Sequence, residues 1–222
     1  KAQQLLRAAV EGGRRLGELG TDGLGVALRS LAYAELRLDQ VDDAERAIAE
    51  ALAIDRLRLG PTHVRVAADL EISASVLEHR VAWREAVEVW REVLRIRKAT
   101  FPPGNRQILL TLQSLGAALT RADAAVEAIA VFGELLASHA AAPTPDVRDL
   151  VDTRLHLANA FEGAGQFDDA ERTLLAALQL ATDRAAGKDR IELARQHLHG
   201  VYVRRGRAAD AARYGKSDGT AR

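Results

Sequence analysis

Cysteine and methionine are absent from the 222-residue chain, proline occurs only five times, and aromatic residues make up 4% of it. Without cysteine, the chain has no disulfide framework and no thiolate metal site. Its 31 basic and 31 acidic residues cancel, so no net charge draws it to nucleic acid or to an anionic membrane. No apolar run approaches the roughly 20 residues that cross a bilayer. We therefore expect a partner that is neither nucleic acid nor membrane.

The start of the chain also lacks the features of an export signal. KAQQLLRAAVEGGRR contains neither an apolar stretch nor a small-residue cleavage site, so we expect a cytoplasmic location. Because there is no initiator methionine, we interpret the chain as a piece of a longer protein or as a processed one. The abundant residues are Ala, Leu, Arg and Glu, a composition that favours helices.

One helical phrase occurs twice. QVDDAERAIAEALAI at 40–54 and QFDDAERTLLAALQL at 166–180 are identical at eight of fifteen positions and start 126 residues apart, which is three times 42. Sampling every 42nd residue gives four columns that stay in phase. They are Ala44, Ala86, Ala128, Ala170 and Ala212; Ile48, Trp90, Phe132 and Leu174; Leu52, Leu94, Leu136 and Leu178; and Pro61, Pro103 and Pro145. A fixed period of this length is typical of a repeat array.

Each unit of the array contains two helical segments. Ala44, Ile48 and Ala51 share one stripe of a helix, because spacings of three and four residues return to the same face. Another helical segment precedes this stripe, and the recurring prolines separate one unit from the next. The preceding helices carry their own column of small residues, namely Ala32, Ala74, Gly116, Ala158 and Gly200. Small residues in both columns predict that the two helices of a unit cross closely.

No pattern in the chain predicts catalysis or metal binding. His197 and His199 diverge on a helix, and the other histidines are scattered. The glycine-rich stretch 17–25 lacks the Lys-Ser/Thr of a phosphate-binding loop and is expected to be a flexible connection. Acid pairs at 42–43 and 168–169 recur in phase at a helix start, where they complement the helix dipole. We therefore expect no catalytic residue, no metal and no cofactor.

The two tryptophans lie on one face of a helix. Trp83 and Trp90 are seven residues apart, and Trp90 falls in the column of large residues. Packing is the first interpretation for both, and a ligand-binding aromatic pair is the alternative.

The stretch LANAFEGAGQFDDAERTLLAALQL at 157–180 follows a known pattern closely. Leu157 and Ala158 form a Leu-small pair, Phe161 follows three residues later, and Gly165 marks a turn. With these residues the unit resembles a tetratricopeptide repeat (TPR). Other units depart from the family pattern at the aromatic position (Glu35, Leu77) and at the first leucine (Ser73, His199).

The units are longer than the usual TPR of about 34 residues, which ends its second helix with proline. Arg56, Lys98, Ala140 and Thr182 occupy that place here. ALAIDRLRLGPTHVRVAADL at 51–70 is similar to the inter-repeat stretch of the kinesin-light-chain-like subclass, which is common in bacterial regulators. An Ala/Arg-rich composition also suits a bacterium. The resemblance implies an all-α fold, an α-α superhelix in which antiparallel helix hairpins stack into a right-handed solenoid.

This resemblance implies a single solenoid over residues 1–214. Its expected parts are a lone second helix at 1–19 and repeats near 22–60, 62–102, 104–142, 144–186 and 188–214. Gly12 and Gly13 should fray the first helix. Residues 215–222 are expected to form a disordered tail.

First helices line the concave face of such a superhelix, so the family's groove positions can be carried over to this chain. The partner-binding groove residues that this implies are Arg29, Tyr33, Leu36, Arg37, Glu71, Ser75, Glu78, His79, Gln113, Thr120, Arg121, Leu155, Asn159, Glu162, Arg204 and Arg205. Polar side chains mixed with a few apolar ones suit an extended peptide or a partner helix. Reversing Arg29, Arg37 and Arg121 to Glu is expected to weaken partner binding without changing stability.

Two functions fit this groove. The first is a non-catalytic protein–protein interaction scaffold that binds a peptide or partner segment. The alternative is a sensor or regulatory TPR module of a larger bacterial signalling protein, which responds to a peptide or small effector. Only Asn159 fits the Lys-Arg-Asn clamp with which some TPR modules hold a C-terminal carboxylate, so chaperone-tail binding is not expected. An exposed end helix could also pair with another copy of the chain as a homodimer.

Overall fold

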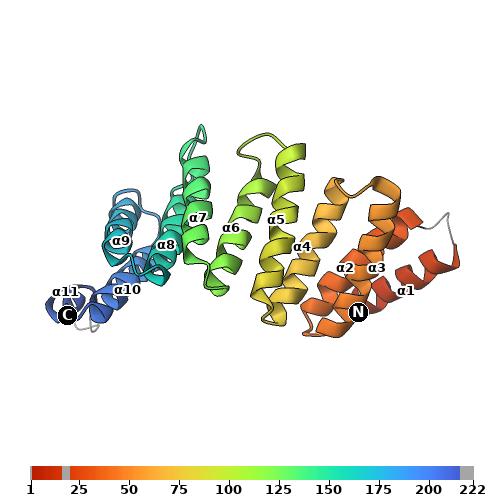
Figure 1. Cartoon of the computed structure of the whole chain (residues 1–222), viewed down its shortest axis with the longest axis horizontal. Helices are drawn as coiled ribbons and strands as arrows, with labels where there is room; N and C mark the ends of the chain where they lie inside the picture. Colours follow the sequence, from red (N-terminus) through yellow and green to blue (C-terminus); the bar gives the residue numbers. More distant parts are fainter. Residues whose placement is uncertain (1, 17–20, 216–222) are drawn as a thin grey trace. The chain divides into compact units, whose positions relative to one another are not determined.

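The computed structural model describes residues 2–16 and 21–215, and in these ranges it contains eleven helices and no strand (Figure 1). The predicted all-α class is confirmed. The helices are α1 (Ala2–Arg15), α2 (Thr21–Leu36), α3 (Val41–Leu59), α4 (Val64–His79), α5 (Trp83–Thr100), α6 (Arg106–Arg121), α7 (Ala125–Ala140), α8 (Val147–Gly163), α9 (Phe167–Asp183), α10 (Lys188–Arg204) and α11 (Ala208–Tyr214).

The helices form two compact units, Lys1–Pro102 (the N-terminal unit) and Pro103–Arg222 (the C-terminal unit). Within each unit, every helix packs against the next one in the chain. The first helices of successive hairpins are also in contact: α2 contacts α4, and α8 contacts both α6 and α10. Consecutive packing of this kind is the arrangement of stacked helix hairpins. No helix in the described ranges has the length and apolar character needed to cross a membrane.

Each of the five hairpins turns through one residue in the left-handed conformation. These residues are Asp39, Val81, Asp123, Gly165 and Gly206, with φ between 58° and 72°. The amide of the residue that follows each of them donates to a carbonyl near the end of the first helix, for example Gln166 to Phe161 at 2.8 Å and Arg207 to Tyr202 at 2.9 Å. The same turn therefore recurs every 42 residues up to Gly165, and the last step is 41.

This shorter last step corrects two predicted positions. Ala212 is exposed, and Ala211 is the buried alanine of α11. In the same register, His199 rather than Gly200 stands where Ala158 stands one repeat earlier, and Leu198 takes the first-leucine position. His199 lies 2.9 Å through Nδ1 from the carbonyl oxygen of Ala211. A fixed sampling step of 42 could not detect the deletion of one residue.

Elsewhere the small and large columns lie in the core as predicted. Ala44, Ala86, Ala128 and Ala170 have no exposed surface, and the large column of Ile48, Trp90, Phe132 and Leu174 is buried. The helices α6 and α7 cross closely, since a Cβ added at Gly116 would lie 2.6 Å from the Phe132 ring. Trp90 packs in the core, and its indole nitrogen donates to Glu78 at 2.7 Å. The packing interpretation of Trp90 is confirmed.

Two expectations about glycine are wrong. Gly12 and Gly13 do not end α1, which continues to Arg15. The glycine-rich stretch 17–25 is not a loop throughout, because residues 21–25 begin α2. Gly25 is buried there, and a Cβ on it would lie 2.9 Å from Oδ1 of Asp55. Gly25 therefore leaves space for the Asp55 carboxylate, and it does not mark a bend in the chain. Residues 17–20, and the predicted tail apart from Gly215, lie outside the described residues.

Candidate partner-binding clefts

In the C-terminal unit, the first helices α6, α8 and α10 border two clefts that share one residue. The α6–α8 cleft has a volume of about 260 Å³ and is lined by Ala117, Thr120, Arg121, Phe132, His156 and Asn159. The α8–α10 cleft has a volume of about 450 Å³ and is lined by Asn159, Glu162, Leu193, Gln196, His197, Gly200 and Arg204. Because Asn159 borders both clefts, a ligand in either of them reaches the same amide.

Helical spacing brings the polar groups of the clefts together. His156, Asn159 and Glu162 follow one another at intervals of three on α8, so they share a face. From α10, Arg204 forms an ion pair with Glu162 across the second cleft. The lack of a side chain at Gly200 leaves room for the Arg204 guanidinium, whose nearest nitrogen would lie 3.3 Å from an added Cβ.

Both histidines of the clefts have a lowered pKa. For His156 the main cause is burial, which a nearby Asp152 opposes. The His156 ring also stacks on Phe132, with ring centroids 5.5 Å apart. Burial likewise lowers the pKa of His197, and the positive charge that His156 can carry lowers it further. Both imidazoles are therefore neutral at neutral pH, and each offers one donor and one acceptor nitrogen.

The chemistry of the clefts suits binding to a polypeptide backbone. The Asn159 amide donates and accepts, as does a peptide group, and the neutral imidazoles add further donors and acceptors. No group of three or more His, Cys, Asp or Glu side chains in the described part of the chain could hold a metal ion.

Five of the predicted groove residues line these clefts, namely Thr120, Arg121, Asn159, Glu162 and Arg204. Leu155 does not, because it is 4% exposed and packs in the core with Val151 and Ala158. Its spacing with those two apolar neighbours is a sequence signal that marks it as core. His156 and His197 take part instead, and both were missing from the predicted groove residues.

The two remaining predicted residues of the C-terminal unit lie elsewhere. Gln113 is exposed on α6. Arg205 pairs with Asp168 at 2.7 Å and with Glu171 at 2.8 Å, and so bridges to α9.

In the N-terminal unit, most predicted groove residues contact their own unit. Leu36 is 7% exposed and belongs to the core. Glu71 pairs with the buried Arg97, and Glu78 accepts from Trp90. Ser75 donates to the carbonyl of Glu71 at 3.1 Å, and His79 lies 2.8 Å from the carbonyl of Ser75. The exposed ones are His79, Tyr33 (55% exposed) and Arg37, and Arg37 has no ion-pair partner among the described residues.

Arg29, also predicted to line the groove, belongs to a buried charged cluster. It donates to Asp69 at 2.9 Å and lies 3.7 Å from Asp55, which Arg65 holds through two hydrogen bonds of 2.8 and 3.1 Å. The cluster joins α2, α3 and α4. Burial raises the pKa of Asp69 to about 6, the Arg29 hydrogen bond opposes this rise, and the nearby Asp55 adds to it. Reversal of Arg29 therefore cannot leave stability unchanged, which corrects that expectation.

No family profile matches the sequence, and no curated protein matches it. Solved structures do match in fold. The kinesin-light-chain-type protein of Podosopora anserina, with nearly identical TPR-like repeats, has 19% identity and a TM-score of 0.75 over 85% of this chain and 90% of its own. BtubC (BKLC) from P. vanneervenii has 15% identity and a TM-score of 0.74 over 96% of this chain and 87% of its own. YrrB, a TPR protein with an unusual peptide-binding site, has 13% identity and a TM-score of 0.57 over 86% and 82%. The fold of this chain is that of a TPR-like α-solenoid.

Proposed function

We propose that this chain is a non-catalytic interaction scaffold, and that the clefts along α6, α8 and α10 hold an extended segment of a partner protein. The observation that carries the proposal is the position of Asn159, which borders both clefts. A segment that lies across α8 and occupies both clefts contacts the Asn159 amide in either chain direction. The side chains of the segment then occupy the spaces on either side.

The composition of the clefts supports a peptide over a small apolar ligand. The clefts combine neutral hydrogen-bonding groups with the Glu162–Arg204 ion pair, and the exposed Leu193 supplies an apolar contact. A peptide backbone needs such alternating donors and acceptors, because its own polar groups lose water on binding. The fold adds support, since YrrB, which has the same fold, has a peptide-binding site.

The proposal is tested by selection from a displayed random-peptide library on the immobilised chain. The dissociation constant of each selected peptide is then measured by fluorescence anisotropy. We expect Asn159→Ala to weaken binding about tenfold or more, because losing hydrogen bonds to an amide that the bound segment covers costs roughly 1–3 kcal/mol. Gln179→Ala removes a similar amide that is exposed on α9, and should leave the affinity unchanged.

Two results would overturn the proposal. One is a set of selected peptides that bind Asn159→Ala as tightly as the parent chain. The other is an equal loss in the Gln179→Ala control.

A further inference from the structure

A separate cleft in the N-terminal unit contains a buried carboxylate oxygen without a partner. The cleft lies between α1 and α3, over α2, and has a volume of about 520 Å³. Glu35 of α2 lines it, with a side chain that is 3% exposed. Its Oε1 accepts from Arg7 at 3.1 Å, whereas Oε2 is buried and has no hydrogen-bond partner among the described residues. A buried acceptor oxygen that has lost its water and found no donor destabilises the folded chain, so the site favours an added donor.

The hairpin itself does not require this carboxylate. Glu35 accepts the turn hydrogen bond through its backbone carbonyl, and the corresponding residues of the other four hairpins are Leu77, Leu119, Phe161 and Tyr202. All four are apolar or aromatic. Because leucine satisfies the turn at this position in two other hairpins, the carboxylate of Glu35 serves contacts other than the turn, among them the ion pair with Arg7.

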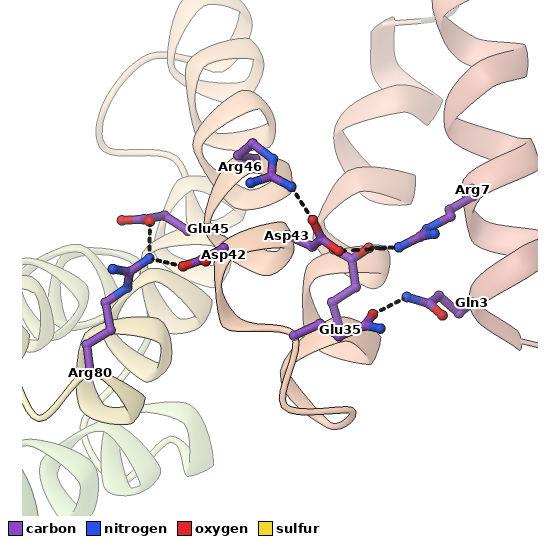
Figure 2. A network of polar contacts seen from close by, with 9 residues as sticks. Gln3, Arg7, Glu35, Asp42, Asp43, Glu45, Arg46 and Arg80 are labelled. Carbon is purple, nitrogen blue, oxygen red and sulfur yellow. Dashed lines mark hydrogen bonds and ion pairs between the residues drawn. The ribbon is translucent and has the colours of Figure 1, made fainter.

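The cations that surround Glu35 are already engaged by other acids. Figure 2 shows Glu35 and Asp43 converging on Arg7 from α2 and α3, while Arg46 turns to Asp43. Further along the cleft, Arg14 pairs with Glu50. The lining holds one more carboxylate than arginine. The additional carboxylate is Glu11, which lies 3.9 Å from Arg15 outside the lining, so the oxygen that still lacks a donor among the described residues is Oε2 of Glu35.

The inner part of the cleft is apolar. Four buried side chains line it, namely Val10, Leu28, Leu31 and Ala47. A long aliphatic side chain with a charged end can pack its methylene groups on such a surface. A single unpaired oxygen in a cleft with apolar lining residues suits a compact ammonium group better than the planar fork of a guanidinium, which needs two acceptors.

We propose that the α1–α3 cleft binds one lysine side chain of a partner protein, with its ammonium group on Oε2 of Glu35 and its methylene groups on the apolar lining. This site uses none of the residues of the α6–α8 and α8–α10 clefts. A failure of either proposal therefore leaves the other standing.

The test is a titration of the isotope-labelled full chain, followed through its backbone amide resonances. The probe is Nα-acetyl-lysine methylamide, and the matched control is the norleucine analogue, which has the same stem without the ammonium group. We expect saturable shifts at Glu35 and Ala47 with a dissociation constant of about 1–10 mM for lysine. Norleucine should bind about tenfold more weakly or not at all.

Variants assign the effect to Glu35. Glu35→Gln should weaken lysine binding about tenfold, because it removes the charge with little change in shape. Asp42→Asn, on the same hairpin but paired with Arg80 at 2.6 Å, should bind lysine normally. If Glu35→Gln fails to fold, Glu35→Tyr removes the carboxylate instead, with a side chain that occupies the same position in the last hairpin as Tyr202. It should keep the fold and abolish binding.

The proposal is overturned if no saturable shift appears, which would mean that a water molecule already supplies the hydrogen bond to Oε2. It is also overturned if norleucine binds as well as lysine, or if removal of the Glu35 carboxylate leaves lysine binding intact. Tighter binding of the arginine analogue would overturn the choice of lysine.

Discussion

In the described part of the N-terminal unit, the buried polar side chains are charged, namely Glu35, Asp55, Asp69 and Arg97. In the described part of the C-terminal unit they are two threonines, Thr111 and Thr153. Thr111 satisfies its hydroxyl within its own helix, by donating to the carbonyl of Gln107 at 2.7 Å. A buried carboxylate has no such option, and Asp69 depends on Arg29 of another hairpin. One repeat architecture thus contains two kinds of interior.

The difference teaches how each unit can fix its helices relative to one another. The N-terminal unit uses directional ion pairs across three helices. The Asp55 carboxylate in this cluster lies so close to α2 that only glycine fits at position 25. The buried interior of the C-terminal unit uses close apolar contact, with the Phe132 ring against Gly116, whereas its ion pairs between helices, such as Arg205–Glu171, are partly exposed. Ion pairs respond to charge reversal and to pH, whereas close packing responds to added volume.

The largest effect is expected from Arg29→Glu. It places a third carboxylate beside Asp55 and Asp69, and should destabilise the N-terminal unit by about 3 kcal/mol or more. Region-resolved hydrogen exchange of the full chain measures this loss. Arg37→Glu, an exposed change near the end of the same helix, should stay within about 0.5 kcal/mol of the parent. Equal protection in both variants would contradict the structural role of the cluster.

A smaller loss is expected from Gly116→Ala in the C-terminal unit. The added methyl group would meet the Phe132 ring at 2.6 Å and should cost about 1–3 kcal/mol. The matched control is Gly133→Ala on α7, where nothing lies within 4 Å of the added Cβ. That change should instead stabilise the unit by about 0.5–1 kcal/mol, through helix propensity. Thermal unfolding of the two variants tests the opposite signs, and a shift of the same sign in both would refute the close crossing.

The smallest effect is a response to pH with opposite sign in the two units. The pKa of Asp69 is raised to about 6, so the stability gained from its proton is present at low pH and is lost as pH rises through that value. The pKa values of His156 and His197 are lowered from 6.5, so the stability gained from their neutral forms is present above 6.5 and is lost as pH falls below it.

Between about pH 5 and pH 8, the Asp69 contribution should change by about 1 kcal/mol. Hydrogen exchange, corrected for its intrinsic pH dependence, should show that acidification protects the N-terminal unit and exposes the C-terminal unit. Asp69→Asn should remove the first response and leave the second. A parallel response of both units in the parent chain would count against the comparison.

The sequence by itself determined the repeat and its internal layout. The same hairpin crossing occurs in each repeat, and it has room for nothing larger than a methyl group. Alanine therefore recurs in phase at this position, as Ala44, Ala86, Ala128 and Ala170. The packing of Trp90 followed from the same periodicity, and the turn at Gly165 was implied by the resemblance to the TPR pattern. Such features are local, so spacing along the chain is sufficient to reveal them.

Tertiary structure decided the rest. Arg29 contacts Asp69 across 40 residues, and Arg7 contacts Glu35 across 28. Neither pair has a spacing that a sequence pattern would mark. His156 lines a cleft, whereas its neighbour Leu155 packs in the core. Adjacent residues on a helix point about 100° apart, and the neighbouring helices determine which of the two directions is buried. The ion pairs between hairpins depend on how the hairpins pack against one another, which the sequence of a single helix does not determine.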